Sequence, residues 1–181
     1  KTGRIIHFGR FFGICVEKNS ELPPEQRKMK YLVVFQGNRV VTQDWATALF
    51  QDLGSSPATM DGAKAADAFS CFPDYESERA DAEQAFVQAD LLGTEAWAAL
   101  PPEAWPQAWI DAGYRRPVVR FHKALYGHPG SGTYWEQHCD KNLRESCFVP
   151  IDNWPPCYTH KELDLFLCLY VDDFKLAGPK K

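Results

Sequence analysis

The sequence lacks any apolar run long enough to cross a lipid bilayer. Its longest run, residues 165–171, has seven residues, whereas a membrane-spanning helix needs roughly 20. No signal peptide opens the chain, and no internal repeat or low-complexity linker interrupts it. With 45% hydrophobic and 24% charged residues, the composition is that of an ordinary soluble globular protein. Because the first residue is Lys1 rather than Met, we expect the chain to be a piece of a longer protein.

Paired cysteine motifs are also missing. The six cysteines are scattered without CxxC spacing: Cys15, Cys71, Cys139, Cys147, Cys157 and Cys168. With no secretory signal, we expect reduced thiols rather than disulfides. One zinc alternative stays open, because Cys157 and His160 have ligand spacing and could be completed by His138, Cys139 or Cys147.

An overall positive charge is absent. The net charge is −4, which argues against a simple nucleic-acid binder. The charge is unevenly spread, however. Residues 1–40 hold eight Lys or Arg against three Glu, a net charge of +5, whereas residues 61–111 hold eleven acids against two basic residues, a net charge of −9. This asymmetry is typical of a protein that binds polyanions at one end and metal ions at the other, and equally of a solvated surface.

The strongest positive signal is a hairpin pattern at residues 165–178. An unbroken apolar run ends in Asp172 and Asp173, after which the sequence turns apolar again. This pattern predicts strand, turn and strand, with two carboxylates at the tip. A buried strand seldom ends on two acids unless a cation compensates them, and Mg²⁺ prefers carboxylate oxygens. The alternative is a solvated Asp-Asp turn.

Weaker patterns predict the remaining elements, and residues 1–27 predict only irregular or edge chain. We expect strands at 30–35, 39–42 and 117–125, a helix from Ser56-Pro57 to about residue 72, a glycine-containing loop at 126–132 and a helix at 133–147. The second helix is amphipathic, and its inward side chains would be Trp135, Cys139, Leu143 and Cys147.

Four short motifs follow one another between residues 28 and 178. They are Lys30-Tyr-Leu-Val-Val-Phe-Gln-Gly37, Asp81-Ala-Glu-Gln-Ala-Phe86, Lys123-Ala-Leu-Tyr-Gly127 and Tyr170-Val171-Asp172-Asp173. In kind and order they resemble the fingers strand, the first palm motif, the second palm motif and the YxDD box of reverse transcriptases from copia-type retrotransposons. The resemblance covers most of the chain.

The resemblance implies an RNA-directed DNA polymerase that transfers nucleotides with two Mg²⁺ ions, or Mn²⁺ in their place. Asp81 and Asp172 would hold the metals directly, and Asp173 would support them more loosely. Phe86 would lie beneath the sugar of the incoming nucleotide and exclude a ribose 2′-hydroxyl, with ordinary core packing as the alternative. Further substrate contacts would come from Lys30, Tyr126, Gly127 and Tyr170.

The implied fold is α+β: a right-hand polymerase palm, which is an antiparallel sheet with the helices at 56–72 and 133–147 on one face, plus partial fingers. We expect residues 1–55 to be partial fingers and residues 56–181 to be palm. Thumb and RNase H would be absent from this single compact fragment, which would have weak or no activity alone. Its partners would be an RNA template, a DNA primer, deoxynucleoside triphosphates and the rest of a retroelement polyprotein, in a cytoplasmic particle or the nucleus.

Two features depart from the copia pattern. Leu32 stands where the fingers usually carry a basic residue, and His128-Pro-Gly-Ser-Gly132 replaces the usual Leu-Lys-Gln-x-Pro. Leu32 and the end of the chain at Lys181 favour a competing interpretation, a catalytically inactive remnant that binds nucleic acid, whereas the intact set of three acids opposes it. A second competitor is another palm-type metal enzyme, such as a nucleotide cyclase, which shares paired acids but should lack the Leu-Tyr-Gly element and the tyrosine before the acids.

Overall fold

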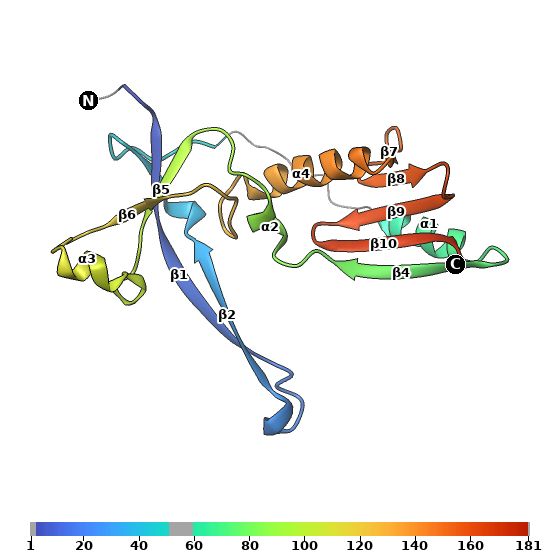
Figure 1. Ribbon diagram of the computed structural model, residues 1–181, viewed down its shortest axis with the longest axis horizontal. Coiled ribbons are helices and arrows are strands. Elements are labelled where there is room, and N and C mark those ends of the chain that lie inside the picture. Colours follow the sequence, from blue (N-terminus) through green and yellow to red (C-terminus); the bar gives the residue numbers. More distant parts are fainter. Residues whose placement is uncertain (1–2, 51–59, 181) are drawn as a thin grey trace. The chain divides into compact units, whose positions relative to one another are not determined.

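The computed structural model describes residues 3–50 and 60–180. Within these residues the chain forms two compact units (Figure 1). Residues 3–50 pack with 90–131 in what we call the N-terminal unit, and residues 60–89 pack with 132–180 in the C-terminal unit. Each unit contains one five-stranded sheet together with helices, so the chain is α+β as the sequence predicts.

The sheet of the N-terminal unit is mixed. Its strands have the order β2–β1–β5–β6, with β3 also paired to β1. Strands β1 and β5 run parallel, and the other pairs are antiparallel. The bounds are β1 Ile6–Lys18, β2 Lys28–Phe35, β3 Val41–Thr42, β5 Glu95–Ala99 and β6 Val118–Arg120, with short helices η1 Pro24–Gln26, η2 Gly37–Arg39, η3 Pro102–Ala104 and α3 Gln107–Asp111 in the connections.

Strand β1 departs most from the sequence prediction. Where irregular or edge chain is expected, Ile6–Lys18 is one strand of 13 residues that pairs with β5 over its first part and with β2 over the rest. Its glycines explain the weak pattern, because a Cβ at Gly9 or Gly13 would strike the ring of Phe35 or Tyr31. Glycine inside a strand lowers strand propensity but permits such a close approach.

The first residues of β1 are buried or half-buried, and most of the remaining residues are exposed. The core of the unit consists of Phe35, Val40, Ala48, Ala96, Ala98 and Phe121. Residues 11–18 of β1, by contrast, pair only with residues 28–35 of β2; we call these two segments the β1–β2 arm (Figure 1). The arm exposes large apolar side chains, namely Phe12, Ile14, Val16, Met29, Tyr31 and Val33.

The sheet of the C-terminal unit is antiparallel throughout, with the order β4–β10–β9–β8–β7. Its strands are β4 Tyr75–Asp81, β7 Val149–Pro150, β8 Cys157–His160, β9 Leu165–Tyr170 and β10 Asp173–Pro179, and its helices are α1 Met60–Ser70, α2 Ala85–Gln88 and α4 Ser131–Glu145. The hairpin predicted at residues 165–178 is confirmed as β9 and β10.

Helices α1 and α4 cover opposite faces of this sheet, so the prediction that both lie on one face is wrong. From α1, Ala66 packs against Phe166 and Cys168 of β9. From α4, Trp135 and Cys139 pack against Leu167 and Leu169, which alternate with Phe166 and Cys168 along β9. Since successive side chains of a strand point to opposite faces, the unit has three layers. The physical reason is that β9 is apolar on both faces, and each face needs a cover.

Several predicted bounds also shift. The strand expected at 117–125 shrinks to Val118–Arg120, and the helix expected at 133–147 runs from Ser131 to Glu145. Cys147 therefore lies beyond the helix and is exposed rather than inward. The predicted helix start at Ser56-Pro57 lies outside the described residues, where α1 is first seen at Met60. Within residues 3–50 and 60–180, no helix is both long enough and apolar enough to cross a membrane.

Candidate active site

The hairpin tip is a two-residue turn between two residues that the sequence singled out. Tyr170, the last residue of β9, pairs with Asp173, the first residue of β10. The turn itself consists of Val171 and Asp172, and Val171 has a positive φ of 56°. Such a value is uncommon for any residue but glycine and is an outlier for a β-branched one. The tip therefore has a defined and strained conformation.

Asp81 lies directly opposite Asp173. The two residues end neighbouring antiparallel strands, β4 and β10, and are Cα partners in the register. Directly opposed residues point to the same face, with Cβ atoms about 5 Å apart, and like charges in such a pair are destabilising. The fold thus brings together two carboxylates that are more than ninety residues apart in sequence, in an arrangement that a cation would stabilise.

The third predicted acid, Asp172, stands beside this pair in the turn. Its carbonyl oxygen accepts a hydrogen bond of 2.7 Å from the backbone N–H of Ala82, the residue after Asp81. Asp172 is half-buried, whereas Asp81 and Asp173 are exposed. In the part of the chain that is described, no group of three or more His, Cys, Asp or Glu side chains is arranged to hold a metal ion. Two of the acids are therefore face to face, and the third is tied to them through the backbone.

The Asp81–Asp173 pair lies on the face of the sheet that α1 covers. Two residues further along, Arg79 and Lys175 are also cross-strand partners. The Lys175 ammonium forms a 2.5 Å ion pair with Asp67 of α1. On this face a groove of about 580 Å³ is lined by Met60, Ala63, Arg79, Cys168, Leu169, Tyr170, Asp173, Phe174 and Lys175. One of the acids, Asp173, thus lines the same groove as the cationic side chains of Arg79 and Lys175.

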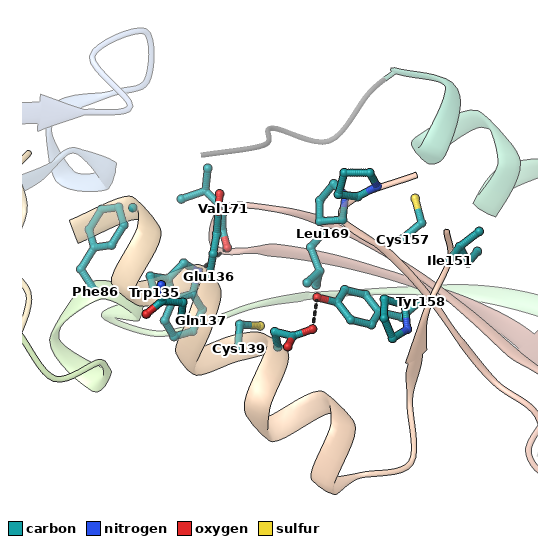
Figure 2. Close-up of a pocket in the computed structure, with 15 residues that line it drawn as sticks. Phe86, Trp135, Glu136, Gln137, Cys139, Ile151, Cys157, Tyr158, Leu169 and Val171 are labelled. Atoms are coloured by element: carbon teal, nitrogen blue, oxygen red, sulfur yellow. Dashed lines mark hydrogen bonds between the residues drawn. The ribbon is translucent and has the colours of Figure 1, made fainter. Parts of the chain in front are cut away.

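A second cavity, of about 470 Å³, involves helix α4 (Figure 2). Its walls are mostly apolar and aromatic: Phe86, Gly132, Trp135, Glu136, Gln137, Cys139, Asp140, Pro150, Ile151, Pro155, Pro156, Cys157, Tyr158, Leu169 and Val171. The hairpin tip reaches it through Val171, and α4 adds two carboxylates to the wall. The cavity has the size and lining of a small-ligand site.

Polar side chains in the wall of this cavity are fixed by one another. The Tyr158 hydroxyl donates a 3.0 Å hydrogen bond to Asp140 (Figure 2), and Arg144 donates to the other oxygen of that carboxylate at 2.7 Å. Burial, then this hydrogen bond, raises the pKa of Tyr158. Burial and the neighbouring Asp140 raise the pKa of the Cys139 thiol to about 11. The Cys139 thiol therefore stays protonated and unreactive near neutral pH.

Phe86 lies between a core cluster and the α4 cavity. Its side chain lines the α4 cavity, as does Val171, and it is half-buried against a core cluster that contains Ala85 and Trp135. It follows the turn at Gln84, whose φ is 54°. The side chain therefore contributes both to the core and to the cavity wall.

Three further predicted substrate contacts, Lys30, Tyr126 and Gly127, belong to the N-terminal unit. Lys30 is exposed on the β1–β2 arm, opposite Val16. The Tyr126 carbonyl accepts a 2.8 Å hydrogen bond from Phe35 N–H. Gly127 has a φ of 86°, and a Cβ there would strike the Phe35 carbonyl oxygen. Gly127 is therefore required by the close approach of two backbone segments.

The sequence missed the role of Trp135, which it predicted only as an inward side chain of a helix. The indole N–H donates a 2.6 Å hydrogen bond to the Val171 carbonyl in the hairpin turn. A buried tryptophan usually finds a partner for its N–H, but nothing in the sequence indicates which one. This bond links α4 to the turn that carries Asp172.

The structure opposes the zinc alternative. Cys157 packs on the α1 face, whereas His160, three residues further along the same strand, contacts the ring of Phe148 at 5.1 Å, and Phe148 belongs to the α4 face. Two residues at this spacing in a strand point to opposite faces, so they do not form a common half-site.

Comparison of the chain with family models, with curated proteins and with solved structures finds no match.

Proposed function

We propose that the chain is part of an RNA-directed DNA polymerase of a copia-type retroelement, acting on an RNA template, a DNA primer and deoxynucleoside triphosphates. The observation that carries the proposal is the register of β4 against β10, which sets Asp81 opposite Asp173 next to Asp172. Such a like-charge pair costs stability unless a cation offsets it. Two-metal nucleotidyl transfer needs acids from two separate segments at one place.

The donor set suits Mg²⁺. Carboxylate oxygens are the ligands that this hard ion prefers, with water and substrate phosphate completing its coordination. Asp81 and Asp172 would be the direct ligands, and Asp173 the looser one. When bound, the ions would activate the primer 3′-oxygen and neutralise charge on the triphosphate. The hydrogen bond from Ala82 to Asp172 would hold the direct ligands in a common frame.

Substrate contacts follow from the remaining residues. Tyr170 shares a face with Asp173 because the two are directly paired, which suits contact with the primer end. In the N-terminal unit, Lys30 would bind the triphosphate as a point charge. Tyr126 and Gly127 would approach the nascent base pair. Phe86 would lie beneath the deoxyribose.

Primer extension tests the proposal. The 181-residue chain, alone and within the full polypeptide that its gene encodes, is assayed with Mg²⁺ on a primed RNA template. We expect Asp172→Asn to abolish extension, because the substitution removes an anionic ligand. Its melting temperature should hold or rise slightly, since repulsion with Asp173 is relieved. Asp152→Asn, an exposed acid in a loop of the same unit, is the matched control and should extend primers normally.

Each result has a defined meaning. Undiminished extension by Asp172→Asn would show that Asp172 is not a ligand. A parent protein that binds the primed template without extending it in either form would support the inactive remnant instead. Failure both to bind and to extend would overturn the proposal.

Phe86 tests the substrate preference. If the ring lies beneath the sugar, Phe86→Ala or Phe86→Val should raise the ratio of ribonucleotide to deoxyribonucleotide incorporation, because a steric gate acts by exclusion. If the ring is core packing only, Phe86→Ala should instead cost roughly 3–5 kcal/mol of stability and leave the ratio unchanged. Melting temperature and both incorporation rates are measured on the same protein. Relaxed selectivity with preserved folding supports the gate.

A further inference from the structure

The hairpin turn holds a strained residue beside two of the predicted acids. Val171 has a φ of 56°, a region that β-branched side chains avoid because of their bulk. Its side chain is 44% exposed, so burial of the valine does not explain the conformation. Residues held in sparsely populated backbone regions persist only where the surroundings fix them. Contacts with neighbouring residues must therefore hold this turn in place.

Two hydrogen bonds fix both carbonyl groups of the turn. The Val171 carbonyl accepts from the indole of Trp135 at 2.6 Å, and the Asp172 carbonyl accepts from the N–H of Ala82 at 2.7 Å. Trp135 is only 4% exposed and is packed among Leu167, Leu169 and Ala85. The donor is thus part of the core, whereas the acceptor belongs to an exposed tip. A rigid element restrains a turn that would otherwise be free to change.

An alternative turn is chemically accessible. Only Val171, the first of the two turn residues, has a positive φ, which is the pattern of a II′ turn. The I′ turn has positive φ at both residues and is related to it by rotation of the peptide plane between them. Aspartate tolerates positive φ better than most residues, so Asp172 permits this rotation. The rotation would swing the Val171 carbonyl away from Trp135 and turn the Asp172 side chain.

We propose that Trp135 is a positioning residue whose indole N–H selects the turn conformer that aims Asp172 at the metal site. The proposal rests on the proposed function for the identity of that site, but the conformer that Trp135 selects is a property of the turn itself. Trp135 touches neither metal nor substrate; it acts through the Val171 carbonyl. Outer partners of this kind typically change metal affinity by about 10- to 100-fold when lost.

The test compares loss of the indole N–H with loss of an indole elsewhere. Trp135→Phe keeps an aromatic ring but removes the donor. Trp154→Phe is the matched control, because Trp154 is another partly buried tryptophan of the same unit, packed on the opposite face against Phe166. Mn²⁺ binding is measured on the 181-residue chain by electron paramagnetic resonance. Backbone amide spectra of residues 170–173 report the turn, and melting curves report folding.

We expect Trp135→Phe to weaken Mn²⁺ binding about 10-fold and to shift or broaden the amide signals of Asp172 and Asp173, with Trp154→Phe unchanged in both. In a form that extends primers, the Mg²⁺ concentration for half-maximal activity should rise by about the same factor, while KM for the nucleotide stays within about twofold. Unchanged metal binding and unchanged turn signals in Trp135→Phe would overturn the inference, whether or not the parent protein extends primers. Metal binding that depends on Trp135 in a protein without polymerase activity would refute the proposed function alone.

A second substitution separates the hydrogen bond of Trp135 from its packing. Val171→Gly leaves α4 untouched and removes the strain, since glycine accepts positive φ without penalty. If the indole holds the valine turn in a strained conformer, Trp135→Phe should cost more stability in the glycine background than in the parent, because only the valine turn regains strain energy when it relaxes. Equal losses in both backgrounds would mean that Trp135 contributes packing alone and would overturn the inference.

Discussion

The two sheets of this protein have equal numbers of strands but differ in how far their apolar side chains are buried. In the C-terminal unit, four consecutive residues of β9, Phe166 to Leu169, are buried, because α1 and α4 cover both faces. In the β1–β2 arm of the N-terminal unit, apolar residues alternate with polar ones and glycine along β1, yet Phe12, Ile14 and Val16 are all exposed. Strands with apolar side chains thus form in both units, but these side chains are buried only where helices supply a second layer.

The difference matters for function. A sheet covered on both faces resists bending, because close-packed interiors transmit strain rather than absorb it. Acids at the end of such a sheet, like Asp81 and Asp173, keep a fixed spacing. The arm is a two-stranded ribbon beyond residue 11, and isolated ribbons are only marginally stable. A fixed geometry is therefore expected at the strand ends of the C-terminal unit, and an adaptable one in the arm.

Shortening one apolar side chain in each sheet should give the largest difference in unfolding free energy between the two units. Leu167 is 3% exposed and Ile14 is 38% exposed. Leu167→Ala should cost about 3 kcal/mol of unfolding free energy through the cavity it leaves, whereas Ile14→Ala should cost less than about 1 kcal/mol, as substitutions at poorly buried sites do. Denaturant unfolding of both variants measures the contrast. Equal losses would mean that the arm is buried in solution.

Acid should act on the N-terminal unit. Burial, and secondarily the nearby His7, lowers the pKa of His128 from 6.5 to about 4. Between about pH 6.5 and pH 4, His128 is therefore protonated in the unfolded chain but neutral in the folded unit. Stability is lost as the pH falls through that window. The loss should approach about 3 kcal/mol. Segment-resolved hydrogen exchange at pH 7 and pH 4.5 checks it, and His122→Gln, an exposed histidine of the same unit, should keep the acid sensitivity that His128→Gln reduces.

Alkali should act on the C-terminal unit instead. Burial raises the pKa of Cys139 from 9.0 to about 11, so the unfolded state loses its thiol proton first. Stability should fall as the pH rises above about 9, by about 2 kcal/mol near pH 10.5. Melting curves from pH 8 to pH 10.5 on the parent and on Cys139→Ala measure the effect. A pH slope that Cys139→Ala leaves unchanged would contradict the assignment.

Substitution of two glycines with positive φ distinguishes the cost of backbone strain from the cost of steric crowding. Gly127 has a φ of 86°, and a Cβ there would also lie 2.6 Å from Val34 Cγ1, whereas Gly113 has a φ of 73° and open space around the corresponding position. Gly113→Ala should cost about 1 kcal/mol, and Gly127→Ala about 2 kcal/mol or more. Thermal unfolding of both variants tests this order. A larger loss at Gly113 would show that crowding at Gly127 is relieved by movement of its neighbours.

Removing the ion pair between α1 and β10 should have the smallest effect. Lys175 is mostly buried, but its partner Asp67 is 61% exposed, and exposed pairs contribute little. The Lys175 ammonium also donates to the Ala63 carbonyl at 3.2 Å, which remains in Asp67→Asn. We expect a loss of less than about 1 kcal/mol in denaturant unfolding. A loss several times larger would mean that this pair, rather than apolar packing, attaches α1 to the sheet.

The sequence by itself determined the local elements whose pattern is strong. The run of residues 165–171 with its two acids predicted the β9–β10 hairpin, and the period of helix α4 placed Trp135 and Cys139 inward, because hydrophobic period follows directly from backbone geometry. It also predicted, through a resemblance, that Asp81, Asp172 and Asp173 come together, and of these the structure pairs Asp81 with Asp173. Strand β1 was not predicted because Gly9 and Gly13 lower its strand propensity. Both glycines leave room for neighbouring aromatic rings.

Only the tertiary structure decided which side chains share a face. Whether α1 and α4 lie on one face or two depends on how β9 is paired, and pairing joins residues that are far apart in the chain. For the same reason the sequence showed neither the register that opposes Asp81 to Asp173 nor the bond from Trp135 to Val171. A hydrogen bond between a helix and a turn 36 residues away leaves no periodic trace in the sequence, because its partners are selected by packing of the whole unit.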